Sequence, residues 1–435
     1  MQFMENMKKY YLSTFGCQMN VHDSEKIAGI LQSEDYKETD NPKEADIIIF
    51  NTCSIRQKAE QKFYSELGRI KPLKKRNPGL TIAVAGCIAQ QEGEKIRKRA
   101  GFVDHVIGPQ NIHILKDVLK SRPEMIAVGD NPLITETDLP VYRKDTFRAW
   151  INIMYGCNNF CSYCIVPYTR GREKSRPLES IVSEVKKLAD QGYKEITLLG
   201  QNVNSYRSSV DFPCLLKELN DISGIERIRF VTSHPKDLSR ELIIAVRDLK
   251  KVCEHIHLPL QSGSSRILKL MNRKYTYEEF LDNVLELKEE IPEIAITSDI
   301  ISGFPGETAE DHLSTIQALK EIEFDGIYAF NYSPRPGTKA SLMEDHLDDD
   351  EKSSRLSEIL DLQGNITEQK NKKLEGTFQE ILVEGFSEKS KNILTGRNRA
   401  NKIVTIPLEK RIKQGDIVTV TITRAHRHSL EGSTL

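Results

Sequence analysis

Short apolar segments alternate with helical segments from Lys8 to about Lys373. No other feature of the sequence restricts the possible folds as much as this alternation. In the first part of the chain, ADIIIFNTC and TIAVAGC have the length and apolar character of buried strands. Polar stretches with an apolar stripe, such as IRQKAEQKFYSELGRIK, separate them. Strands joined through helices are parallel, and both faces of their sheet are covered. We therefore predict a doubly wound parallel α/β domain over residues 8–124.

The rest of the chain divides into three further segments. Residues 125–144 include GDNP and TDLPVYRKD, whose Pro, Asp and Gly content is typical of a linker. Residues 145–373 hold six strand–helix repeats, which predict a partial (β/α)6 barrel. Residues 374–435 change to short strands with Gly turns, such as DIVTVTITRA, and predict a small all-β barrel.

Three cysteines stand close together directly after the strand AWINIMYG, in the order Cys157-Asn-Asn-Phe-Cys161-Ser-Tyr-Cys164. Thiolates are the usual ligands of iron–sulfur clusters, and three thiolates on a four-iron cluster leave one iron open for a substrate. A structural zinc site is the alternative, but it usually has four protein ligands, and no fourth Cys or nearby His completes this set. An iron–sulfur cluster is the favoured interpretation.

A second set of cysteines is spread over the N-terminal domain. Cys17, Cys53 and Cys87 are 36 and 34 positions apart, and each ends or closely follows an apolar strand. Because the carboxyl ends of parallel strands face one crevice, the three thiols are expected to converge. The alternative is three separate buried cysteines. Cys214 and Cys253 carry no such pattern and are expected in the core.

These motifs resemble those of the radical S-adenosylmethionine methylthiotransferases. The CxxxCxxC motif after the first barrel strand is the superfamily signature, and FGCQMNVHDSE, NTCSIRQKAEQKFYSELGRIK and AVAGCIAQQEGE resemble the family's N-terminal domain. ILTGRNRANKIV and VTVTITRAHRHSLEG resemble a TRAM domain, an RNA-binding β-barrel. The resemblance covers nearly the whole chain.

The resemblance implies two [4Fe-4S] clusters, a radical cluster on Cys157, Cys161 and Cys164 and an auxiliary cluster on Cys17, Cys53 and Cys87. One S-adenosylmethionine would be cleaved to the 5′-deoxyadenosyl radical and a second would donate the methyl group. Residues 8–124 would then be the methylthiotransferase domain, 145–373 the radical core and 374–435 the RNA-binding domain. No catalytic residue is expected beyond the cluster ligands.

The expected substrate follows from the branch of the family that the chain resembles. NTCSIRQKAEQK, CNNFCSYCIVPYTRGREKSRP and LLGQNVNSY most resemble the branch that adds a methylthio group to C2 of N(6)-dimethylallyladenosine at position 37 of tRNA. Other branches act on threonylcarbamoyladenosine of tRNA or on an aspartate of a ribosomal protein. A metal-dependent RNA methyltransferase without radical chemistry and a non-catalytic iron–sulfur RNA-binding protein are the alternatives from other classes.

Further site residues are predicted from position and charge. Active sites of βα barrels form at the carboxyl ends of the strands, which suggests S-adenosylmethionine contacts at Gln201, Asn202, Ser233, Gln261, Asp299 and Gly303. The resemblance implies a further contact at Tyr163, because in this superfamily an aromatic residue between two of the ligands lies by the adenine. The net charge of −1 excludes a uniformly basic surface, but residues 370–435 carry thirteen Lys and Arg against seven Asp and Glu. RNA contacts are predicted at Arg170, Arg172, Lys174, Arg176, Arg397, Arg399, Lys402 and Arg424.

The remaining expectations concern partners and location. No apolar run approaches the roughly 18 residues of a membrane span, and the N-terminus lacks the apolar region of a signal peptide. A cytoplasmic monomer without membrane contact is expected. Its partners would be the tRNA anticodon stem-loop and an electron donor such as a flavodoxin or ferredoxin, while the sulfur donor is left open.

Overall fold

The structure is a computed structural model that describes residues 7–54, 57–120, 124–388 and 390–435. The chain forms two compact units. The first comprises Met1–Lys144, Trp150–Asn158 and Ile165–Arg176, and the second comprises Asp145–Ala149, Asn159–Cys164 and Pro177–Leu435. The boundary between them passes through the loop of Cys157, Cys161 and Cys164, so that Cys157 belongs to the first unit.

The first unit contains a six-stranded parallel sheet in the order β2-β1-β3-β4-β5-β6. Its strands are β1 (Lys9–Thr14), β2 (Lys37–Glu38), β3 (Ile47–Thr52), β4 (Thr81–Gly86), β5 (His105–Ile107) and β6 (Met125–Ala127). This confirms the predicted doubly wound sheet. The edge strand β6 comes from the beginning of the segment predicted as a linker.

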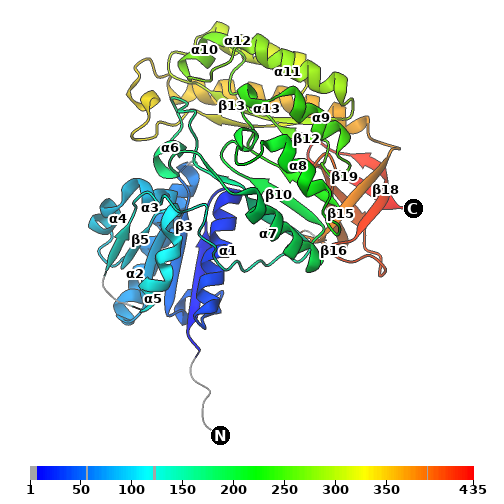
Figure 1. The fold of residues 1–435 in the computed structure, drawn as a ribbon. Helices are drawn as coiled ribbons and strands as arrows, with labels where there is room; N and C mark the ends of the chain where they lie inside the picture. The colour runs from blue at the N-terminus through cyan, green and yellow to red at the C-terminus, as the bar shows by residue number, and fades with distance from the viewer. Residues whose placement is uncertain (1–6, 55–56, 121–123, 389) are drawn as a thin grey trace. The chain divides into compact units, whose positions relative to one another are not determined.

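Helices cover both faces of this sheet (Figure 1). They are α1 (Gln18–Ser33), α2 (Gln57–Arg76), α3 (Cys87–Glu92), α4 (Glu94–Arg99) and α5 (Leu115–Lys120), with short 3-10 turns η1 (Pro42–Glu44) and η2 (Pro109–Ile114). Ile48 and Phe50 of β3 pack with α2, α3 and α4, whereas Ile47 and Ile49 pack with α1 and α5. Because alternate residues of β3 face two separate cores, the strand is apolar throughout rather than alternating.

Six barrel strands form two three-stranded sheets, β11-β10-β7 and β12-β13-β14. The pairs β10–β11, β12–β13 and β13–β14 are parallel. The strands are β7 (Arg148–Asn152), β10 (Glu195–Leu199), β11 (Arg227–Phe230), β12 (His255–His257), β13 (Ala295–Ser302) and β14 (Gly326–Asn331). A parallel bridge between Ile228 and Val252 connects β11 to the segment before β12. The order of the six strands confirms the predicted partial (β/α)6 barrel.

The barrel helices lie between these strands in the sequence. They are α7 (Leu178–Asp190), α8 (Phe212–Asn220), α9 (Arg240–Asp248), α10 (Ser265–Leu270), α11 (Tyr277–Glu290) and α12 (Ala309–Ile322), with 3-10 turns η3 (Val203–Ser205) and η4 (Pro235–Asp237). A further 3-10 turn, η5 (Lys339–Leu342), follows β14. Thr276 and Glu279 form a capping box at the start of α11, and Thr308 and Asp311 form one at the start of α12. Each box satisfies two backbone N–H groups that the helix itself leaves without partners.

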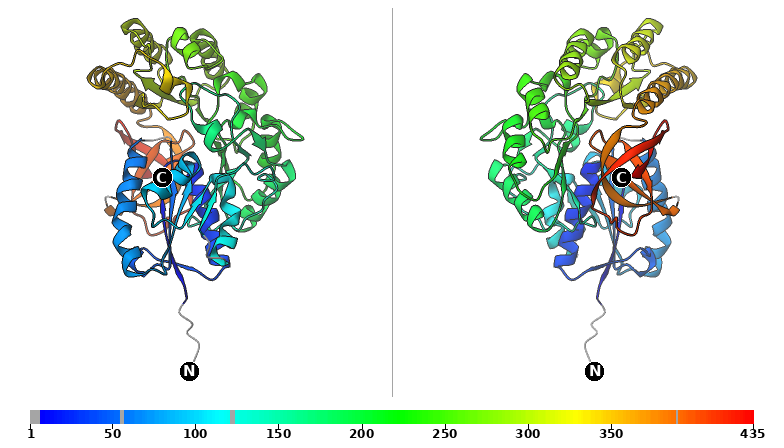
Figure 2. Two further views of the ribbon diagram at one scale, coloured as in Figure 1. Left: turned by 90° about the vertical axis from the view of Figure 1, so that its left-hand side faces the viewer. Right: turned by 90° about the vertical axis from the view of Figure 1, so that its right-hand side faces the viewer.

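The C-terminal segment is a closed five-stranded barrel in the order β15-β16-β17-β19-β18 (Figure 2). It follows α13 (Asp349–Lys372) and consists of β15 (Phe378–Ser387), β16 (Ser390–Asn398), β17 (Ile403–Pro407), β18 (Ile417–Ala425) and β19 (Leu430–Thr434). Two buried arginines of β11 bind it. Arg227 donates to Glu380 at 2.8 Å, and Arg229 donates to the backbone oxygen of Asn398 at 2.7 Å. The predicted small all-β barrel is confirmed.

Candidate functional site

Cys17, Cys53 and Cys87 stand at equivalent ends of three neighbouring strands. Cys17 follows β1 and caps α1, Cys53 directly follows β3, and Cys87 follows β4 as the first residue of α3. Cys17 and Cys53 are hydrogen-bonded to each other. A Cβ atom at Gly16 would lie only 2.2 Å from the Cβ of Cys53, so the close approach of the two loops requires glycine there.

A buried arginine lies beside these thiols. Arg170 is 5% exposed, is hydrogen-bonded to Cys87, and donates to the Asp23 carboxylate at 2.7 Å. The hydrogen bond with Cys53 lowers the pKa of Cys17 to about 5, against the effect of burial, and Arg170 acts in the same direction. Burial raises the pKa of Cys87, an effect that Arg170 opposes. In this structure the charge of Arg170 is buried and paired with Asp23, and its contact with RNA phosphates stays a prediction.

The donor set of this site fits an iron–sulfur cluster. It consists of thiols at one sheet edge beside a cation, and thiolates are what such clusters bind. Within residues 7–54, 57–120, 124–388 and 390–435, no three His, Cys, Asp or Glu side chains lie close enough together to hold a single metal ion. A four-iron cluster spreads its ligand sulfurs further apart than a single ion does, so this spacing is compatible with a cluster.

Cys157 begins the other cysteine motif in the first unit. Its backbone N–H donates to the backbone oxygen of Gly171 at 3.1 Å, and its side chain is buried. The preceding Gly156 has a φ of +69°, and a Cβ there would lie 2.1 Å from the backbone oxygen of Arg172. Only glycine allows the chain to turn this tightly from β8 (Met154–Tyr155) into the motif, opposite the paired strand β9 (Lys174–Ser175).

Cys161 and Cys164 lie in the second unit, where the turn after α10 holds their loop. Ser162 donates through its backbone N–H to Met271 and through its hydroxyl to the backbone oxygen of Leu270. The Asn272 amide donates to the backbone oxygen of Phe160 at 2.9 Å. The sequence analysis missed this turn, because its residues carry no motif and lie about 110 positions from the cysteines.

Buried polar atoms without hydrogen-bond partners gather at the carboxyl ends of the barrel strands. After β10 and β11 they include both amide atoms of Gln201, Oδ1 of Asn202 and Oγ of Ser233, three residues predicted to contact S-adenosylmethionine. The described residues offer these atoms no partner. Because a buried polar atom without a partner costs free energy, such atoms indicate a surface that faces a polar ligand.

Four residues that the sequence analysis missed share this property. They are His234 after β11, Ser302 at the end of β13, and Asn331 and Tyr332 at the end of β14. Burial lowers the pKa of His234 to about 2. The rule that placed Gln201 and Ser233 at the site, position at the end of a barrel strand, would have found all four residues.

The other predicted cofactor contacts are in varied surroundings. Gln261 follows β12 and is buried, with a φ of +74°. Asp299 of β13 lies 3.4 Å from Nε2 of His257. The backbone N–H of Gly303 donates to Glu307, and a Cβ there would lie 2.4 Å from Lys352. Tyr163 packs in the apolar cluster of Ile267 and Phe304.

Most of the predicted RNA-binding residues make contacts within their own unit. Arg399 donates to both carboxylate oxygens of Glu254, Lys402 pairs with Asp325 at 3.0 Å, and Arg397 pairs with Glu384 at 3.1 Å. Lys174 pairs with Asp130, and Arg176 donates to the backbone oxygen of Asn152. Arg399 and Lys402 thus bind carboxylates of the barrel in this structure, and their contact with RNA stays a prediction. Arg172 and Arg424 are exposed.

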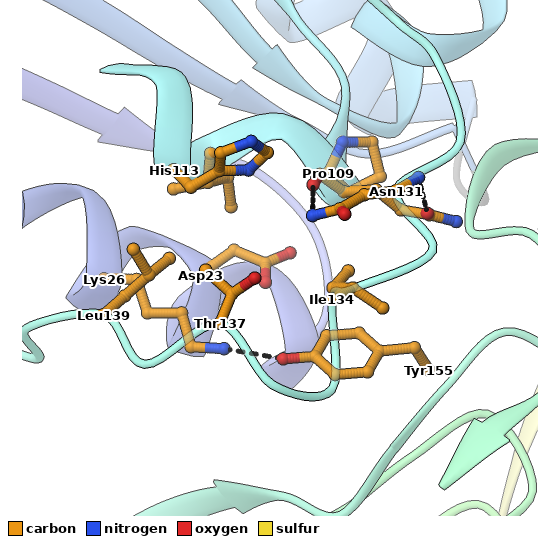
Figure 3. A pocket seen from close by; sticks show the side chains of 11 residues that line it. Asp23, Lys26, Pro109, His113, Asn131, Ile134, Thr137, Leu139 and Tyr155 are labelled. Carbon is orange, nitrogen blue, oxygen red and sulfur yellow. Dashed lines mark hydrogen bonds between the residues drawn. The ribbon is translucent and has the colours of Figure 1, made fainter. Parts of the chain in front are cut away.

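The first unit also contains a pocket that is lined by none of the predicted site residues, although Asp23, which pairs with Arg170, lines it. This small pocket, partly open to solvent, is lined by Asp23, Lys26, His113 and Tyr155, among others (Figure 3). Lys26 there donates to the Tyr155 hydroxyl at 3.1 Å.

All eight cysteines are thiols. Cys253 is buried as expected, but Cys214 is exposed. No helix among the described residues is long and apolar enough to cross a membrane.

Comparisons with known proteins find matches to three parts of the chain. Three family models match, described as Uncharacterized protein family UPF0004 over residues 9–108, Radical SAM superfamily over 151–319 and TRAM domain over 372–435. A tRNA-2-methylthio-N(6)-dimethylallyladenosine synthase from Thermodesulfovibrio yellowstonii is 57% identical, with 97% of each chain covered. One from Acetivibrio thermocellus is 50% identical over 98% of this chain and 91% of its own.

Solved structures share the fold at low identity. The radical S-adenosylmethionine methyltransferase TsrM from Kitasatospora setae, with cobalamin and a [4Fe-4S] cluster bound, has a TM-score of 0.58 at 16% identity, with 77% of each chain covered. The cobalamin-dependent radical enzyme OxsB has a TM-score of 0.52 at 12% identity and covers 81% of this chain and 56% of its own. These likenesses support the fold class alone.

Proposed function

Because this chain belongs to the tRNA-2-methylthio-N(6)-dimethylallyladenosine synthase family, we propose that it adds a methylthio group to C2 of N(6)-dimethylallyladenosine at position 37 of tRNA. It is a transferase of sulfur-containing groups within the radical S-adenosylmethionine superfamily. Relatives of this one name cover nearly the whole chain, which favours this substrate over threonylcarbamoyladenosine and over a ribosomal-protein aspartate.

The enzyme uses two [4Fe-4S] clusters and S-adenosylmethionine. In our proposal, Cys157, Cys161 and Cys164 hold the radical cluster, and their spacing in one loop supports this assignment. The residues Cys17, Cys53 and Cys87 would hold the auxiliary cluster, supported by their positions on adjacent strand ends. When bound, the radical cluster supplies the electron that cleaves S-adenosylmethionine, and the auxiliary cluster supplies an open iron for sulfur.

The protein's own residues bind and orient the cofactor. Gln201, Asn202 and Ser233 present buried polar atoms that S-adenosylmethionine, with its amino, carboxylate and ribose groups, would satisfy. The Asn202 amide nitrogen donates to Asp237 at 2.7 Å, which fixes the side chain so that its Oδ1 is left for a ligand donor. Phe304 and Met271 pack in one apolar cluster with Tyr163 of the cysteine motif, where they would limit the access of water to a reactive radical.

The C-terminal barrel would bind tRNA, since its match to the TRAM family and its exposed Arg424 fit an anionic partner. The domain division into residues 8–124, 125–144, 145–373 and 374–435 is part of this proposal. So are a flavodoxin or ferredoxin as the electron donor, a monomeric state, and the cytoplasm as the location, where tRNA is modified.

The observation that carries the proposal is the placement of two cysteine trios at strand ends of two different βα folds. The test is anaerobic reconstitution with iron and sulfide, followed by reduction with S-adenosylmethionine and a tRNA that carries dimethylallyladenosine 37. We expect about eight irons per chain, 5′-deoxyadenosine, and the 2-methylthio nucleoside by mass spectrometry of digested tRNA.

The alternatives predict other results. Zinc in place of iron would favour a metal-dependent methyltransferase without radical chemistry. Intact clusters without 5′-deoxyadenosine would favour a non-catalytic RNA-binding protein. A methylthio group on tRNA with threonylcarbamoyladenosine, and none on the dimethylallyl substrate, would move the protein to another branch of the family.

A further inference from the structure

Arg273 is a buried arginine in direct contact with one of the proposed cluster ligands. The residue is 4% exposed, and its Nη1 lies 3.4 Å from Sγ of Cys161. The same nitrogen donates to the Tyr163 hydroxyl at 3.3 Å. Arg273 therefore reaches the cysteine motif at two positions, although it lies 112 residues further along the chain.

The rest of the guanidinium is held rigidly by neutral oxygen atoms. Nε donates to the Tyr275 hydroxyl at 2.9 Å, and Nη2 donates to the backbone oxygen of Pro259 at 2.9 Å. The Tyr275 hydroxyl itself donates to the backbone oxygens of Pro259 and Leu260. These bonds fix the plane of the guanidinium, so that Nη1 keeps its direction toward Cys161.

The charge of Arg273 has no carboxylate partner among the residues that the structure describes. Its hydrogen-bond partners are two tyrosine hydroxyls, one backbone oxygen and one cysteine sulfur. Arginine stays protonated in proteins, and burial of an unpaired charge is costly. The other arginine near a cysteine trio differs, because Asp23 neutralises Arg170. The positive charge of Arg273 is therefore not neutralised by its neighbours in the described part of the chain, and an anion bound at Cys161 would compensate it.

We propose that Arg273 is a positioning residue that supplies the countercharge for the radical cluster and raises its reduction potential. The inference rests on the proposed function, which places a cluster on Cys161. Three thiolates on a four-iron cluster make a net anion, and its reduction takes one electron from the reduced electron-donor protein without forming a bond or moving a proton. A buried cation stabilises the more negative reduced form, and an N–H donor to a ligand sulfur acts in the same direction.

The test is an electron paramagnetic resonance titration of the reduced radical cluster against applied potential in the full-length reconstituted chain. Spectra with and without S-adenosylmethionine identify the radical cluster, because only the cluster that binds this cofactor changes its signal. Arg273→Gln removes the charge, and Arg273→Lys keeps it without the planar fork. Lys274→Gln, at an exposed neighbouring position, is the matched control, because solvent screens its charge.

We expect the midpoint potential to fall in Arg273→Gln, to fall less in Arg273→Lys, and to stay at the unsubstituted value in Lys274→Gln. If Arg273→Gln does not retain the cluster but Arg273→Lys does, the need for a cation is likewise supported. Equal potentials in all four proteins would overturn the inference, as would loss of the cluster in both Arg273 variants. If the unsubstituted chain holds no iron–sulfur cluster, it is the proposed function that fails.

Discussion

The Nη2 atom of Arg170 lies 2.7 Å from Oδ2 of Asp23, and both side chains are buried. Removal of one partner of a buried ion pair leaves an uncompensated charge, which costs about 3–5 kcal/mol. We therefore expect Asp23→Ala to lower the free energy of unfolding of the cluster-free chain by about that amount. Urea unfolding followed by circular dichroism measures it.

The double variant Asp23→Leu with Arg170→Met is the control for this pair. It removes both charges together and replaces them with apolar side chains, so it should be more stable than Asp23→Ala alone. If the double variant is no more stable than Asp23→Ala, the loss of stability in Asp23→Ala does not come from the unpaired charge of Arg170.

Substitution of Cys17, Cys53 and Cys87 by Ala separates the two proposed clusters. We expect the product to disappear while 5′-deoxyadenosine is still formed, and the iron content to fall from about eight to about four atoms per chain. Cys214→Ala, which removes an exposed cysteine, is the control and should leave both products unchanged. Full methylthio product from the triple variant would contradict the two-cluster mechanism.

The sequence predicted the fold and the cysteines because both depend on local patterns. The apolar runs before Cys17, Cys53 and Cys87 place these residues at strand ends without any knowledge of tertiary contacts. The role of Arg170 could not be predicted in this way. Its sequence neighbours Arg172 and Lys174 suggest a basic patch, and only packing against Asp23 shows a buried pair. The sequence analysis missed Arg273 for the same reason.

Ser233→Ala should weaken binding of S-adenosylmethionine without destabilising the protein. The Ser233 hydroxyl is buried and has no partner in the structure, so its removal costs the ligand-free chain nothing. Loss of one hydrogen bond to the ligand is worth roughly 0.5–1.5 kcal/mol, or about a twofold to tenfold rise in Kd. Equilibrium dialysis with the reconstituted protein measures this rise, and thermal unfolding checks stability.

Ser223→Ala, in the exposed segment before β11, is the matched control and should keep the original Kd. An unchanged Kd in Ser233→Ala would remove Ser233 from the cofactor site.

His255 should make the protein less stable in acid. Burial lowers its pKa to about 3, and Arg229 and His257 act in the same direction. In the unfolded chain His255 therefore binds a proton below about pH 6.5, whereas in the folded chain it binds this proton only below about pH 3. As the pH is lowered from about 6.5 to about 3, the free energy of unfolding therefore decreases, by at most about 1.4 kcal/mol per pH unit for this group. Urea midpoints measured from pH 7 to pH 4 should fall less steeply in His255→Gln than in the unsubstituted chain.

His428→Gln, at an exposed position, is the control for His255 and should keep the original pH profile. Parallel profiles for His255→Gln and the unsubstituted chain would show that His255 takes up its proton equally in both states.

Arg424 should contribute to tRNA binding through phosphate contact. It is exposed on β18, whereas Arg399 of the same barrel is bound to Glu254. Each lost phosphate contact lowers the slope of log K against log salt by about 0.7–0.9. We expect Arg424→Gln to weaken tRNA binding and reduce this slope by about one such step, as measured by filter binding over a range of salt concentrations. Glu431→Gln, which removes a negative charge from the paired strand β19, should act in the opposite direction on affinity. If Arg424→Gln leaves the slope unchanged, tRNA does not contact this face of the barrel.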